Sequence, residues 1–178
     1  MKTKLFLSCL IMVIFATTSF SQNNDTLQHV SNFKEKKLSY SFINEYGLRF
    51  GAISNVRPLM ILEVTGVFVN SICFNKKQDM IGIGVGCDAY WLLLGATFPI
   101  FVNYRHYFPS KTNIKPLINT ALGTQINIDG NVVGIYNTVS GGFRYKALSL
   151  TAGIFLKSWD MIDYMGGAEI KIGYILFK

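Results

Sequence analysis

Few residues in this sequence have the types and spacing that catalysis would need. The only two histidines, His29 and His106, lie far apart in the chain. A histidine base needs a nucleophile and an orienting group close by. The same-face neighbours of His106 in an extended chain are Tyr104 and Phe108, and no serine lies two residues away. We therefore expect no catalytic residues. A lipid-modifying enzyme that uses His106 remains an alternative.

The cysteines suggest neither a metal site nor a disulfide. Cys73 and Cys87 lie on either side of a turn predicted near residues 75–79, which puts their sulfur atoms several residues out of register. We interpret both as small apolar side chains. The third cysteine, Cys9, lies in the predicted signal peptide. Two separated histidines and two separated cysteines in the rest of the chain make a poor metal site, so no metal and no cofactor is expected.

The element that must position any site is the β-strand. From Leu38 onward, apolar and polar residues alternate with period two. Short connectors that carry turn residues, such as Asp129-Gly130-Asn131, divide this pattern into segments of similar length and make neighbouring strands antiparallel. Eight strands are predicted: Leu38–Ile53, Ile61–Phe74, Met80–Trp91, Thr97–Phe108, Lys115–Ile128, Val133–Tyr145, Leu148–Lys157 and Gly166–Phe177. In the second of these, Val67-Phe68-Val69 breaks the alternation and suggests a bulge.

One face of these strands is polar and rich in small residues. Nine of the sixteen glycines fall on it, which suits the narrow bore of an eight-stranded barrel better than a solvated surface. The Gly82–Gly86 alternation lies within a strand and does not match the G-x-G-x-x-G dinucleotide motif. Four acids and four bases share this face and could pair in a confined bore. This predicted charge network consists of Glu45, Glu63, Asp88 and Glu169 with Arg49, Arg105, Arg144 and Lys171.

The other face is apolar, and large aromatic residues lie toward its strand ends. A membrane barrel would turn this face to lipid, with the aromatic residues as interfacial girdles. The predicted girdle residues are Tyr40, Trp91, Phe98, Phe108, Tyr145 and Tyr174. Periodicity alone leaves a second possibility, because a soluble exported barrel would bury the same face around a lipophilic ligand. That barrel would enclose Ile170, Ile172, Tyr174 and Leu176.

The chain also carries a predicted export signal. Lys2 and Lys4 precede a short apolar stretch, and Ser19 and Ser21 have the spacing of a cleavage site. We predict a signal peptide at 1–21, a flexible periplasmic tail at 22–37 and the barrel at 38–178. The basic residues form no stripe among aromatics, so no nucleic acid is expected as a partner.

Three stretches and the C-terminal segment resemble the small bacterial outer-membrane β-barrel domain family, which is porin-like and related to OmpA-type transmembrane barrels. The stretches are Gly82–Tyr90, Phe98–Phe108 and Ile114–Gly123, and the ending Ile172–Phe177 is similar to an aromatic-terminated last strand. The resemblance implies the outer membrane of Gram-negative bacteria, lipid as surroundings, no cofactor, and barrel assembly machinery that reads Phe177. Lys178 after this phenylalanine departs from the family pattern.

Together these observations predict an all-β, eight-stranded antiparallel up-and-down transmembrane β-barrel, expected to be a monomer with a structural or porin-like role. The balanced charges could form either a plug or a narrow selectivity constriction. The predicted outer loops, residues 54–60, 92–96, 129–132 and 158–165, are short, so long binding loops are not expected.

Overall fold

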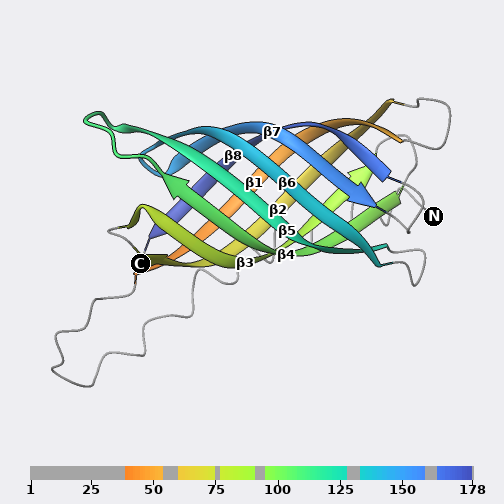
Figure 1. The fold of residues 1–178 in the computed structure, drawn as a ribbon, viewed down its shortest axis with the longest axis horizontal. Helices are drawn as coiled ribbons and strands as arrows, with labels where there is room; N and C mark the ends of the chain where they lie inside the picture. The colour runs from red at the N-terminus through yellow and green to blue at the C-terminus, as the bar shows by residue number, and fades with distance from the viewer. Residues whose placement is uncertain are drawn as a thin grey trace, which may run out of the picture.

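The protein is a closed barrel of eight antiparallel strands in sequence order, with β1 paired to β8 (Figure 1). The computed structural model describes residues 39–53, 60–74, 77–90, 95–127, 133–158 and 164–177. The strands are β1 (Ser39–Ile53), β2 (Met60–Phe74), β3 (Asp79–Tyr90), β4 (Gly95–Tyr107), β5 (Ile114–Asn127), β6 (Val133–Tyr145), β7 (Leu148–Ser158) and β8 (Tyr164–Phe177). The eight-stranded up-and-down prediction is confirmed, and each predicted strand end lies within two residues of the observed end.

Several predictions concern residues outside these ranges. They include the signal peptide at 1–21, the tail at 22–37, the girdle residue Trp91 and most of the four outer loops. No helix among the described residues is long and apolar enough to cross a membrane.

The bulge predicted in β2 is wrong. Pairing of β2 with β1 runs without interruption from Cys73 to Met60, and pairing with β3 is equally regular. Val67 and Val69 point inward and are buried, whereas Phe68 lies between them on the outer face. The alternation is hidden in the sequence because both faces of the sheet are apolar at this point.

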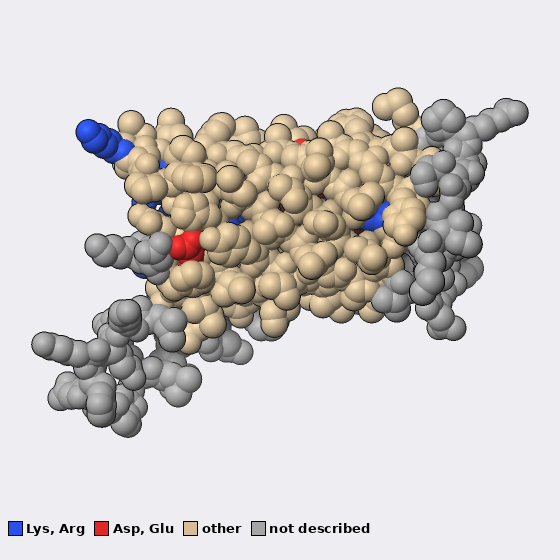
Figure 2. Space-filling model, viewed as in Figure 1, with Lys and Arg blue, Asp and Glu red and all other residues tan. Residues whose placement is uncertain are grey.

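Most outward positions of the strands carry apolar side chains, whereas polar residues, glycines and a smaller set of apolar residues share the inward positions. Figure 2 shows the result as a barrel wall that is almost free of charged atoms. Along the outward positions of the described strands, Asp79 at the start of β3 is the sole Asp, Glu, Lys or Arg. Inward glycines let neighbouring backbones and side chains fill a narrow interior. At Gly142, for example, a Cβ atom would collide with the backbone of Leu150 and Thr151 on β7.

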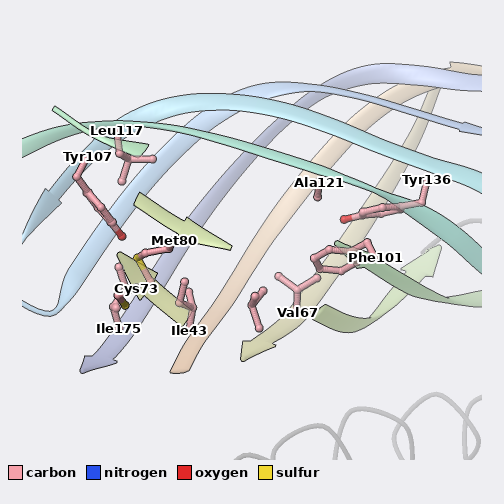
Figure 3. Packing of buried hydrophobic residues seen from close by; sticks show 11 residues of the cluster. Ile43, Val67, Cys73, Met80, Phe101, Tyr107, Leu117, Ala121, Tyr136 and Ile175 are labelled. Carbon is pink, nitrogen blue, oxygen red and sulfur yellow. The ribbon is translucent and has the colours of Figure 1, made fainter. Parts of the chain in front are cut away.

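Apolar side chains fill the interior in two clusters. The larger extends from the middle of the barrel toward the end where β1 begins, and Figure 3 shows it around Ile43, Phe101 and Tyr136. The smaller, Ile61, Tyr90, Phe155 and Met165, closes the opposite end of the interior. Both apolar clusters contact charged groups of the bore: Tyr136 and Phe155 lie beside Arg49, and Tyr90 lies beside Lys157.

The two cysteines within the described strands are free and buried, as predicted. Cys73 of β2 is paired with Met80, and Cys87 of β3 is paired with Gly66. The two sulfur atoms are therefore separated along the same hairpin, which is why no disulfide forms.

Candidate functional site

Within the described residues, acidic and basic side chains meet as buried ion pairs in the bore. Its centre is Arg49 of β1, which lies directly across from Glu63 of β2 and Glu169 of β8 in the strand register. Arg49 Nη1 is 2.9 Å from Glu63 Oε1, and Arg49 Nε is 2.8 Å from Glu169 Oε2. Asp88 of β3, one strand further on, approaches the same Nη1 through Oδ2 at 2.8 Å. One guanidinium thus joins carboxylates from three strands, as its fork of five donors permits.

Two lysines complete this group. Lys157 of β7 places its Nζ 2.6 Å from Glu63 Oε1 and also contacts Asp88 Oδ2. Lys171 Nζ is 2.7 Å from Glu169 Oε1. We call Arg49, Glu63, Asp88, Lys157, Glu169 and Lys171 the Arg49 cluster. Its three acids and three bases balance, so no net charge is buried.

Lys157 was not among the eight residues of the predicted network. The alternation did place it on the polar face of β7, beyond Ser149, Thr151 and Gly153. No acid faces it in the β6–β7 or β7–β8 register, however, because Lys157 pairs there with Tyr136 and Met165. Its carboxylate partners come from β2 and β3 across the interior. Only closure of the barrel brings them within reach.

Aromatic side chains hold the guanidinium of Arg49 in place. Arg49 Nη2 donates a 2.6 Å hydrogen bond to the hydroxyl oxygen of Tyr136 on β6. The Arg49 Cζ atom lies 5.2 Å from the Tyr136 ring centroid and 5.3 Å from that of Phe155 on β7. Thr65 of β2 donates a 2.6 Å hydrogen bond to Asp88 Oδ1. The sequence pattern gave no role to Tyr136 and Phe155, although both have the parity of the bore.

A second, smaller ion pair lies closer to the end where β1 begins. Arg105 Nη2 of β4 is 2.5 Å from Glu45 Oε1 of β1, across the interior. Amide side chains surround the pair: Asn119 Oδ1 accepts hydrogen bonds from Asn103 Nδ2 at 2.7 Å and from Arg105 Nε at 3.4 Å. Both charged side chains are buried, so loss of either would leave its partner without water or a counter-charge.

Arg144 lies on the inner face, as predicted, but the structure separates it from the acids. It is two residues from the β6–β7 turn, where its Nε donates a 2.5 Å hydrogen bond to the Lys146 carbonyl oxygen. Its Cζ atom lies 4.2 Å from the centroid of Phe177 and 5.3 Å from that of Tyr107. Within the described residues, rings therefore take the place of a carboxylate, because the bore acids lie deeper in the barrel.

The predicted girdle aromatics have different surroundings. Tyr40, Phe108, Tyr145 and Tyr174 are exposed on the outer face, near the end where β1 begins. Phe98 is half-buried on the outer face of β4 toward the opposite end. Phe177, predicted as an assembly signal, turns its ring inward and contacts Arg144 at the mouth of the bore. The girdle and assembly-signal roles of these residues stay predictions.

His106 has a partner that the sequence analysis missed. On the outer face, His106 Nδ1 lies 2.6 Å from Asp79 Oδ1, and the Tyr104 hydroxyl donates a 2.8 Å hydrogen bond to the same oxygen. Asp79 and His106 are direct partners in the β3–β4 register, but the predicted turn at 75–79 had placed Asp79 outside the strand. No group of three or more potential metal ligands of the His, Cys, Asp and Glu types occurs in the described part of the chain.

Comparison with known proteins identifies the fold. No protein-family model matches the sequence, and no curated protein does. The crystal structure of Neisserial surface protein A (NspA) aligns with a TM-score of 0.55 at 8% identity, over 76% of this chain and 96% of that one. The crystal structure of the outer membrane enzyme PagL aligns with a TM-score of 0.54 at 11% identity, over 73% and 98%. This chain therefore has the eight-stranded barrel fold of these proteins.

Proposed function

We propose that this chain is an integral β-barrel of the bacterial outer membrane, with a structural role and a closed bore. The observation that carries the proposal is the outer surface. All eight strands present large apolar side chains outward, and several are more than half exposed, such as Ile83 at 67%, Ile172 at 61% and Leu122 at 61%. A soluble monomer rarely exposes apolar area that continues around its whole circumference. A bilayer would cover this surface, and closure of the barrel leaves no unpaired strand edge in lipid.

The same surface argues against a soluble carrier of lipophiles. Such a protein would bury Ile170, Ile172, Tyr174 and Leu176 around its ligand, but all four side chains point out of the barrel. The interior combines packed apolar clusters with buried ion pairs and amides, and these polar groups are poor surroundings for an apolar ligand.

Membrane integration is tested by fractionation of cells that express the full chain, followed by gel migration with and without heating. We expect the protein in the outer-membrane fraction, extractable only with detergent, with a migration that changes on boiling as the barrel unfolds. Recovery from the soluble periplasmic fraction without detergent would overturn the proposal.

The bore supports a plug rather than a pore. The Arg49 cluster joins side chains from β1, β2, β3, β7 and β8, and the apolar group of Ile61, Tyr90, Phe155 and Met165 lies beside it. Interiors of eight-stranded barrels are just wide enough for side chains to fill. Planar-bilayer recording tests this part of the proposal: the expected result is no steady conductance, whereas sustained ion-selective openings would contradict it.

We also propose no catalytic role. Asp79 would orient the His106 ring, and the other described contact of that ring is Phe108, which is not a nucleophile. The protein reconstituted with phospholipid or lipid A should leave both intact. Hydrolysis that disappears in a His106→Ala variant, while the barrel stays folded, would establish an enzyme instead.

A further inference from the structure

The end of the barrel where β1 begins and β8 ends carries a group of cations that belongs neither to the Arg49 cluster nor to the Glu45–Arg105 pair. Lys77 lies in the β2–β3 turn, Lys111 in the β4–β5 turn and Lys146 in the β6–β7 turn, while Lys115 and Arg144 lie at the adjoining ends of β5 and β6. The four lysines are exposed, and Arg144 is partly exposed. We call these five residues the basic rim. Figure 2 shows blue basic atoms at this end, one group of which projects from the molecule, with an acidic group beside them.

None of the five forms an ion pair with an acid of the described residues. Arg144 and Lys77 both lie over the ring of Phe177, with Lys77 Nζ 5.5 Å from its centroid. Lys115 is the direct cross-strand partner of Arg144. Like charges at directly opposed positions destabilise a strand pair, so this end of the barrel gains stability when an anion approaches.

The outer face shows where the rim lies relative to a bilayer. Asp79, His106 and Tyr104 form a hydrogen-bonded polar group on the outside of β3 and β4, close to the strand ends. Tyr145 and Tyr174 are exposed on the outer face near the same end. Polar groups and tyrosines of this kind are favourable at the interface between hydrocarbon and headgroups. The three turn lysines therefore lie at the level of the lipid phosphates.

We propose that the outward lysines of the basic rim, Lys111 and Lys146, bind the phosphate headgroups of anionic phospholipids in the leaflet that surrounds this end of the barrel. Lys77, Lys115 and Arg144 lie at the mouth of the bore and add to the positive potential that attracts these lipids. The cations are spread over three successive hairpins rather than gathered in one pocket, which fits a ring of lipids better than a single ligand. Lysine side chains lay their methylene stems along apolar surface while the ammonium group reaches a phosphate. The proposal rests on the membrane integration proposed above.

The test measures which lipids the purified, detergent-solubilised full chain retains. Phosphatidylglycerol and phosphatidylcholine with the same acyl chains are added in equal amounts, and bound lipids are counted by native mass spectrometry. Phosphatidylglycerol should be retained in preference. A variant with Lys111→Gln, Lys115→Gln and Lys146→Gln should lose about tenfold in this preference, because each cation near a membrane surface adds attraction for anionic lipid. The matched variant with arginine at the same three positions should keep it.

A salt titration and a competition with inorganic phosphate test the same proposal. If the glutamine variant does not fold, the wild-type protein is titrated with sodium chloride, which should abolish the preference by screening. Inorganic phosphate is added separately and should compete no better than chloride at equal ionic strength. Equal retention of the two lipids by the wild type, or displacement of phosphatidylglycerol by phosphate specifically, would overturn the proposal. A folded, membrane-extracted protein without lipid preference would still leave the proposed membrane integration intact.

Discussion

The Arg49 cluster and the mouth of the bore around Phe177 both place arginine on the inner face of the barrel, but with opposite surroundings. Arg49 is fully buried and meets three carboxylates. Arg144 is partly exposed and meets a carbonyl oxygen and two rings. Both residues have inner-face positions in the period-two pattern of the sequence, so the pattern alone does not distinguish them. Depth along the barrel axis separates them, because a buried cation without counter-charges is far more costly than one that reaches water.

The largest effect is expected from removal of the central cation. Arg49→Met would leave three buried carboxylates with only Lys157 and Lys171, and should destabilise the barrel by about 3–5 kcal/mol. Urea unfolding in lipid, followed by the heat-dependent gel shift, measures this change. Arg49→Lys keeps the charge but loses the fork that spans Glu63, Asp88 and Glu169, so it should fall between wild type and Arg49→Met. Equal stability of wild type and Arg49→Met would refute the idea that the cluster is a matched buried unit.

Substitution in the Glu45–Arg105 pair should destabilise the barrel less than substitution of Arg49, because this pair joins only one acid to one base. Arg105→Met leaves Glu45 buried and unpaired, and a loss of about 3 kcal/mol is expected, with a lower unfolding temperature in detergent. In the double variant Arg105→Met with Glu45→Met no charge is stranded, so much of this loss should be recovered. If the double variant is as unstable as the sum of both single variants, the pairing has no energetic importance.

The contrast between the inner and outer faces is tested by two neighbouring glycines of β6. Gly142→Ala would push a Cβ atom into the β7 backbone at Leu150 and Thr151, and overpacking of this kind costs about 1–3 kcal/mol. Gly141→Ala is the matched control on the outer face, where the nearest atom, Leu117 O, is 3.8 Å from the added Cβ. Equilibrium unfolding of both variants should show a loss at Gly142 alone. A larger loss at Gly141 would mean that the faces are assigned the wrong way round.

The smallest effect belongs to the mouth of the bore. Arg144→Ala removes its contacts with Phe177 and Tyr107, which are worth about 0.5–1 kcal/mol at an exposed site. Unfolding in lipid at high salt should give this value, because salt also screens the repulsion from Lys115 across the strand pair. A loss as large as that of Arg49→Met would show that Arg144 has a buried acid partner after all.

Much of the fold follows from the sequence because a strand has a strict period of two. Alternation in β1, β4, β7 and β8 identified inward and outward residues, and short connectors determined that neighbours are antiparallel. Two side-chain pairs are direct cross-strand neighbours: Arg49 and Glu63 in the β1–β2 register, and Asp79 and His106 in the β3–β4 register. The second pairing was missed because Asp79 was assigned to the predicted turn at 75–79, whereas β3 begins at this residue.

The alternation pattern led to a wrong prediction in β2, where both faces of the strand are apolar. Val67-Phe68-Val69 suggested a bulge, yet β2 is regular there, because the inner face needs Val67 and Val69 to pack against the apolar cluster of the bore. A period-two pattern cannot mark the two faces of a strand when both require hydrophobic residues.

By itself, the sequence determined eight strands, their two faces and the charged inner side, because these depend on local geometry and turn chemistry. Only the tertiary structure decided which charges meet. Lys157 reaches Glu63 and Asp88 across the interior, Tyr136 and Phe155 enclose Arg49, and Arg144 is left at the mouth. These contacts join strands that are not neighbours. Which side chains meet depends on closure of the barrel and on the depth of each residue along the barrel axis. The alternation of apolar and polar residues encodes neither.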